Sequence, residues 1–417
     1  MISRREILAA LAAPVLPQGV EILNPRARVP LSWIIDDSTC LVNLNRFAIP
    51  QFADAMGRDR YPQDWRSMPH EIPDSFVRRF AEWSREAGVK GKYSVVPFPA
   101  CTGRLDREVP GWTRQEIEDS VRLVREQVAP NWDIHPEMIT HTRIIDLKTG
   151  HPVEQRGRAW MENWEWCAGR SADEIAAYIA YALSILRNLE LPCEGVTSPG
   201  GFGAGALAEY SLAAGQAVRQ VFRAEIPHYF RNLFDKGNES VAPRIEPGPV
   251  VSIYACTGDW TGNWDCSREP EPDRYISADL KRGRMVEVIE RGEPAIALSH
   301  WTGVWFNGRE LGFKAMQEVV RRLDARFGRA VRWMKLAEIA RYWAVKSLAK
   351  VTLEEGGLSV DSPYDCPDFT VRWPASSLRR LREVTSRAAL EPGAWTRDGP
   401  AHVIACVPLR KGLNRIG

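Results

Sequence analysis

The stretch Val29-Pro-Leu-Ser-Trp-Ile-Ile-Asp-Asp37 lies near the start of this 417-residue chain and says most about its fold. Its apolar part is rich in branched residues, which predicts a buried strand. Two adjacent carboxylates, Asp36 and Asp37, end that strand. Buried carboxylates are costly unless they are paired, hydrogen-bonded or bound to a metal. The pair therefore predicts a functional site, and the alternative is an Asp pair that only caps the next loop.

Strand-like and helix-like patterns alternate from about residue 29 to residue 343. The segments that predict strands are 31–35, 92–96, 136–140, 195–197, 218–222, 250–254, 295–298 and 331–334. Amphipathic patterns predict helices at 74–87, 113–127, 171–189 and 313–326. This alternation predicts a parallel sheet, closed into a barrel or wound open, with functional side chains at the carboxyl ends of its strands.

The sequence patterns at the two ends of the chain differ from the strand–helix alternation of the middle. Ser3-Arg4-Arg5 precedes an apolar stretch up to Leu16, and this resembles a twin-arginine export signal. We therefore expect an export signal and leader over 1–28 and a periplasmic or secreted protein, with a plain amphipathic helix as the alternative. We expect the barrel domain over 29–345. Short alternating segments after it predict a small β-rich region over 346–417.

Composition excludes some partners and favours others. The 55 basic and 53 acidic residues give a net charge of +2, which predicts no nucleic-acid partner. No segment approaches about 18 uninterrupted apolar residues, so we expect no integral membrane span. The 16 Trp favour a carbohydrate partner, because indole rings stack on sugar rings, although core packing is the alternative for any single one.

The eight Cys are scattered and contain no CxxC pair, which argues against a structural zinc site. Cys256 and Cys266 flank a turn-rich segment and could close a loop as a disulfide. Free thiols are the alternative.

Polar residues follow four of the expected strands. They are Asp36-Asp37 after the first, His141-Thr142 after the third, Thr197-Ser198-Pro199-Gly200-Gly201-Phe202-Gly203 after the fourth, and Ser299-His300-Trp301 after the seventh. A lone His at a strand end is more often structural than a ligand. Two such His together with an Asp pair on one rim favour a functional site.

These segments resemble the motifs of the polysaccharide deacetylase superfamily, which includes the nodulation-type chitooligosaccharide deacetylases. The Asp-Asp pair matches the first motif, and Glu137-Met-Ile-Thr-His-Thr142 resembles the second. Ser198-Pro-Gly-Gly-Phe-Gly203 is similar to the third, and Ile296-Ala-Leu-Ser-His300 is similar to the last. The resemblance covers residues 29–343. It implies an α/β fold of the glycoside hydrolase/deacetylase type, a distorted (β/α)7 barrel, here with the small C-terminal β-rich region as an appendage.

The resemblance also implies a metal-dependent hydrolase that removes acetyl groups from a carbohydrate. Asp37 and His141 would hold a divalent metal such as zinc, cobalt, manganese or nickel. Asp36 would be the base and His300 the acid. The substrate-binding residues implied are Ser198, Pro199, Gly200 and Trp301.

Two departures from the family pattern stand out. The family carries a second metal-binding His four residues after the first, where this chain has Ile145. Asp146, Glu162 and Glu165 are the candidates for the third ligand. The third motif lacks the Arg with which the family's motif usually begins.

Two further hypotheses remain because of these departures. One is a metal-free carbohydrate-active hydrolase on the same barrel, with Asp36, Asp37 and Glu165 as its acidic residues. The other is a non-catalytic carbohydrate-binding protein.

Overall fold

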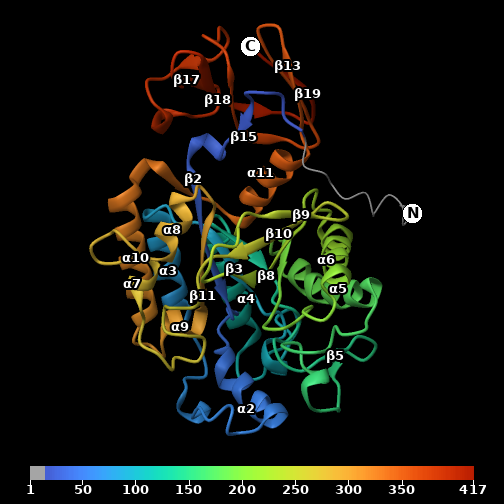
Figure 1. The fold of residues 1–417 in the computed structure, drawn as a ribbon. Coiled ribbons are helices and arrows are strands. Elements are labelled where there is room, and N and C mark those ends of the chain that lie inside the picture. The colour runs from blue at the N-terminus through green and yellow to red at the C-terminus, as the bar shows by residue number, and fades with distance from the viewer. Residues whose placement is uncertain (1–14) are drawn as a thin grey trace.

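The computed structural model describes residues 15–417, and Figure 1 shows a large α/β part with a smaller β-rich part at one end. Most of the segment predicted as an export signal, residues 1–14, lies outside the described residues. No helix within 15–417 has the length and apolar character needed to cross a membrane.

Two sheets of mainly parallel strands form the centre of the α/β part. The first has the order β11 (Ala295–His300), β2 (Val29–Asp36), β3 (Gly91–Ser94) and β4 (Trp132–His135), with β12 (Val331–Trp333) also paired to β2. The second has the order β7 (Gly195–Thr197), β8 (His228–Leu233), β10 (Val250–Ala255) and β9 (Arg244–Glu246), with β9 antiparallel.

Single parallel bridges join these two sheets, one between Glu137 and Thr197 and one between Asp259 and Leu298. The parallel strands therefore follow one another in a cyclic order, but their ladders form two sheets rather than one closed sheet. The predicted α/β class is confirmed, and the closed (β/α)7 barrel stays a prediction.

Helices pack around these strands and at the two ends of the α/β part (Figure 1). They are α2 (Leu44–Met56), α3 (Asp74–Glu86), α4 (Arg114–Leu123), α5 (Ala172–Asn188), α6 (Leu207–Phe222), α7 (Pro272–Tyr275), α8 (Arg284–Glu290), α9 (Trp301–Trp305), α10 (Leu311–Phe327) and α11 (Leu336–Leu348). All four predicted helices are present. Capping boxes begin α4 and α5, because Thr113 pairs with Glu116 and Ser171 with Glu174.

Two of the predicted strands are wrong. Residues 218–222 form the last turns of α6, and the strand of that region is β8. Val218, Val221 and Phe222 recur at helical spacing, which is the period that the prediction overlooked. Residues 136–140 form a loop, because Pro136 lacks the N–H needed to continue the β4 ladder.

The β-rich region contains two further sheets. The strands are β13 (Lys350–Glu354), β14 (Gly357–Ser362), β15 (Cys366–Pro374), β16 (Arg382–Glu383), β17 (Ala394–Arg397), β18 (His402–Leu409) and β19 (Gly412–Ile416). Strand β1 (Glu21–Ile22) pairs with β15, so residues assigned to a leader in the sequence lie in this sheet. All eight Cys are free thiols, so Cys256 and Cys266 form no disulfide.

Candidate active site

The carboxyl ends of the parallel strands surround a cavity of about 270 Å³. The parallel register sets His300, the last residue of β11, beside Asp36, the last residue of β2. Residues 264 positions apart in sequence thus meet at one rim. The cavity is lined by Asp36, Asp37, Phe52, Tyr61, Glu137, His141, Asn163, Trp164, Ser198, Gly200, Gly201, Trp264 and His300.

Three buried side chains at this rim could hold one metal ion: Asp37, Glu137 and His141. His141 Nε2 lies 2.8 Å from Asp37 Oδ1 and 3.3 Å from Glu137 Oε1. The backbone N–H of Asp37 donates to Glu137 Oε2 over 2.8 Å. Asp37 and His141 both have left-handed backbone conformations, with φ values of 61° and 62°. Such conformations are uncommon for residues other than glycine and gather at functional sites.

Glu162 holds the loop that carries His141 in place. Its buried carboxylate accepts hydrogen bonds from the backbone N–H groups of Thr140, at 3.0 Å, and of His141, at 2.6 Å. The hydroxyl of Tyr178 donates to it over 2.6 Å. Burial raises the pKa of Glu162 to about 7, even though these donors act in the opposite direction. Glu162 therefore holds the backbone of the His141 loop by hydrogen bonds and is not one of the three grouped ligands.

The atoms of the cluster fit a divalent cation. Within the described part of the chain, Asp37 Oδ1 is buried and makes no hydrogen bond, although His141 Nε2 is near. Two carboxylates and one imidazole are a donor set that zinc accepts. The Asn163 amide lies 3.3 Å from His141 Nδ1, and its Oδ1 is buried without a partner. With the amide oxygen turned to the ring, Nδ1–H would donate to it and leave the Nε2 lone pair facing the carboxylates.

The charges in the cluster are strongly coupled. Burial alone would lower the pKa of His141, but Asp37 and Glu137 hold that pKa well above its usual range. Burial would likewise raise the pKa of Glu137, yet His141 and Lys92 lower it to about 2. The carboxylates therefore attract a positive charge, either a proton on His141 or a metal ion in its place.

Asp36 has a different environment from its neighbour Asp37. The ammonium group of Lys92, a fully buried residue of β3, donates to Asp36 Oδ1 and, over 2.7 Å, to Ser94 Oγ. Burial and the nearby Glu137 raise the pKa of Asp36 to about 6, against the lowering effect of Lys92 and His300. Asp36 is therefore a carboxylate whose pKa lies near neutral pH, and Lys92 holds it in one orientation.

His300 is oriented by Asp259, which follows β10. The distance between His300 Nδ1 and Asp259 Oδ2 is 2.8 Å. Burial would lower the pKa of His300, but Asp37, Asp259 and Asp36 raise it to about 10. The imidazole is therefore protonated at neutral pH, and its other nitrogen is free to donate a proton to a bound molecule.

Aromatic rings form one wall of the cavity. Phe52 and Tyr61 contact each other at a centroid distance of 5.4 Å, and each contacts Trp164 and Trp264. These four rings come from helix α2, the loop after it, the segment 148–169 before α5, and the loop after β10. Aromatic faces next to charged groups are suited to a ring-shaped polar ligand.

The cavity includes most, but not all, of the residues proposed from the sequence. Ser198 and Gly200 line it beside the acid, base and ligand candidates, whereas Pro199 does not. Trp301 is only 1% exposed, and its ring packs on Phe76 and Phe80. Its predicted role in substrate binding is therefore wrong, because its side chain points into the core.

Of the three candidates for the third metal ligand, Glu162 accepts hydrogen bonds from backbone N–H groups, as described above. Asp146 accepts a hydrogen bond from the Lys148 N–H, and Glu165 is exposed and forms an ion pair with Arg158. None of the three lines the cavity. Glu165 thus lies outside the cavity that Asp36 and Asp37, the other two acidic residues of the metal-free hypothesis, line.

Sequence reasoning missed Glu137, Lys92, Asp259 and the two rings Phe52 and Tyr61. Glu137 stands four residues before His141, and this spacing was the available signal for a ligand pair. Lys92 was visible as a charged residue within an expected buried strand, which requires a buried partner. Nothing in the sequence connects Asp259 with His300, because Asp259 lies in the loop after β10 and His300 ends β11.

No family model matches the chain, and no curated protein matches it. Among solved structures, it is similar to a mutant of a CE4-family pseudoenzyme with restored enzymatic activity, with 12% identity, 64% of each chain covered and a TM-score of 0.30. It is also similar to Puue allantoinase, with 11% identity, 80% of this chain and 93% of the other covered, and a TM-score of 0.38. A third is the 4-alpha-glucanotransferase from Thermococcus litoralis, with 11% identity, coverages of 75% and 40%, and a TM-score of 0.38. These likenesses are too weak to place the chain in a family.

Proposed function

We propose that this chain is a metal-dependent hydrolase that removes an acetyl group from a carbohydrate, on a distorted (β/α)7 barrel. The observation that carries the proposal is the meeting of three kinds of group at one cavity. A candidate ligand set lines the same cavity as a carboxylate that could act as a base and an imidazolium that could act as an acid. Metal-assisted hydrolysis of an amide or ester uses these three functions together.

Asp37, Glu137 and His141 would hold the ion, which when bound would polarise the acyl oxygen and stabilise negative charge on it. The carboxylate of Asp36 would accept the proton of the water that attacks the acetyl carbon. The imidazolium of His300 would give its proton to the leaving nitrogen or oxygen of the sugar. Lys92 and Asp259 would keep the base and the acid oriented throughout.

The volume and the aromatic wall of the cavity favour a small carbohydrate unit as the bound group. Its volume of about 270 Å³ is near the lower end for ligand pockets, about 300–1,000 Å³. Phe52, Tyr61, Trp164 and Trp264 contact one another, so they form a continuous wall on which one sugar ring could stack. These contacts favour one sugar residue or a chain end.

The test is release of acetate from N- and O-acetylated mono- and oligosaccharides, together with the metal content of protein purified without chelator. We expect about one ion or more per chain and acetate release that chelator abolishes and zinc, cobalt or manganese restores. His141→Gln should lose both the rim ion and turnover. His151→Gln is the matched control, because His151 is exposed and lies outside the cavity.

Three outcomes would contradict the proposal. Turnover of glycosidic bonds without metal would favour a metal-free hydrolase. Sugar binding without turnover would favour a carbohydrate-binding protein. If the protein neither binds added metal nor gains thermal stability from it, the metal-dependent mechanism is contradicted.

A further inference from the structure

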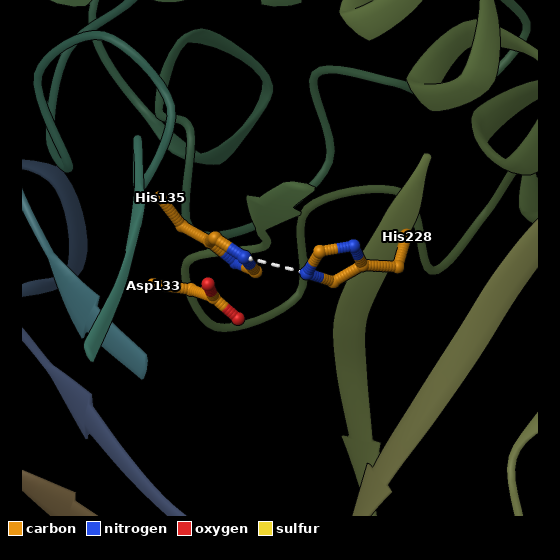
Figure 2. Close-up of side chains that lie close together, drawn as sticks. All are labelled: Asp133, His135 and His228. Carbon is orange, nitrogen blue, oxygen red and sulfur yellow. Dashed lines mark hydrogen bonds between the residues drawn. The ribbon is translucent and has the colours of Figure 1, made fainter. Parts of the chain in front are cut away.

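A second cluster of potential ligands lies inside the ring that the parallel strands of the two central sheets form, away from the candidate active site. It consists of Asp133 and His135 on β4 and His228 at the start of β8. Figure 2 shows the two imidazole rings pointing at each other, with the Asp133 carboxylate beside them. The Nε2 atoms of His135 and His228 are 2.9 Å apart. Neither histidine has any solvent-exposed surface.

Strand register brings these side chains together. Asp133 and His135 are two positions apart on β4 and so share a face of the strand. Gly195 of β7 lies between the two strands and pairs with His228. A Cβ atom at position 195 would come within 2.4 Å of His135 Nε2 and 2.6 Å of His228 Nε2. Only glycine therefore leaves room for both imidazoles over the middle strand.

From this geometry we propose that Asp133, His135 and His228 form a second divalent-metal site, which binds zinc or a similar transition ion. Two imidazole nitrogens and one carboxylate are a common donor set for such ions. Two nitrogens bound tetrahedrally at about 2.0–2.1 Å lie about 3.3 Å apart. The rings would need to separate by only a few tenths of an ångström to accept the ion.

The surroundings support a resident ion. His135 Nδ1 lies 3.3 Å from Thr197 Oγ1, a partner that would orient the ring and leave Nε2 for the ion. Lys92 also lies near His135, but its ammonium group is engaged by Asp36 and Ser94.

Asp133 lies near the amino ends of the strands, next to a residue that lines a second cavity. Asp133 is only half-buried, and its Oδ2 accepts a hydrogen bond of 2.6 Å from the Ala337 N–H at the start of α11. Ala337, Glu194 and Glu338 line a separate cavity of about 360 Å³. An ion could therefore enter from the face opposite the candidate active site.

The experiment counts zinc ions per chain after zinc loading and dialysis, and measures the thermal midpoint with and without added zinc. We expect two ions in the wild type and one in His141→Gln, which should still gain thermal stability from zinc. In the His141→Gln background, both His228→Gln and Asp133→Asn should lose the remaining ion and that gain. Asp133→Asn keeps an acceptor for the Ala337 N–H and is the milder change. His151→Gln in the same background is the control and should keep one ion.

The alternative is a simple N–H···N hydrogen bond between the rings. His141→Gln would then bind no zinc, or the His228→Gln and Asp133→Asn variants would bind as much as their parent. Either result would overturn the second site without bearing on acetate release. Conversely, absence of turnover in a protein that binds two ions would contradict only the proposed function.

Discussion

Adjacent Asp36 and Asp37 illustrate how two identical residues acquire different chemistry. Successive strand residues point to opposite faces, but the left-handed conformation of Asp37 turns the chain so that both carboxylates line one cavity. Lys92 contacts Asp36, whereas His141 and the Glu137 carboxylate surround Asp37. Their neighbours thus separate a proposed base from a proposed ligand.

The pKa values of Asp36 and His300 predict a bell-shaped pH profile. Activity needs Asp36 ionised and His300 protonated, so kcat/KM should rise as pH passes about 6 and fall as it passes about 10. His300→Ala should lower turnover by a factor of about 10²–10⁴ and remove the alkaline limb, with little loss of substrate binding. Steady-state kinetics on an acetylated oligosaccharide from pH 5 to about 11 would test this. Full activity of His300→Ala with a lower melting temperature would leave His300 a purely structural role.

At the scale of elements, the loop between β4 and β5 (Ile145–Asp146) determines where His141 lies. The Glu162 carboxylate supplies acceptors for the N–H groups of Ile139, Thr140 and His141 in this loop. The segment 148–169 therefore contributes both Glu162, which holds the His141 loop, and the Trp164 ring. A positioning role of this kind predicts an effect on metal affinity that does not require contact with the metal.

Glu162→Gln should weaken metal binding at the rim by about 10–100-fold, because an amide presents a donor to backbone N–H groups that need acceptors. Zinc affinity measured by competition with a chromophoric chelator would report the change. Glu165→Gln is the matched control, since Glu165 is exposed and only pairs with Arg158. Unchanged affinity in Glu162→Gln would contradict the positioning role.

At the scale of the whole molecule, the β-rich region and the α/β part share one apolar core. Ile34 and Val251 from the central strands, Ile339 from α11 and Val371 from β15 belong to the same buried cluster. Ile22 near the N-terminus pairs with Val371, so both ends of the described chain close this core. Such continuity predicts that the two parts unfold together.

Val371→Asp should lower the free energy of unfolding by about 3–5 kcal/mol, because it buries an unpaired charge in the shared core. Leu413→Asp is the control and should change it by less than about 0.5 kcal/mol, since Leu413 is 65% exposed. We expect a single thermal transition whose midpoint falls in Val371→Asp. Separate transitions, with the α/β part unaffected by Val371→Asp, would show that the two parts are independent.

The sequence by itself determined the α/β class, the helices with capping boxes and the strand-end positions of Asp36, Asp37 and His300, whereas His141 lies in a loop after β4. These features depend on local periodicity and on the residues that begin and end elements, and both are visible along the chain. Only the tertiary structure decided that Glu137 joins the ligands, that Asp259 orients His300, that Trp301 is core and that His135 meets His228 over Gly195. Each of these depends on strand register and loop conformation, which arise from contacts between residues far apart in sequence and leave no local pattern.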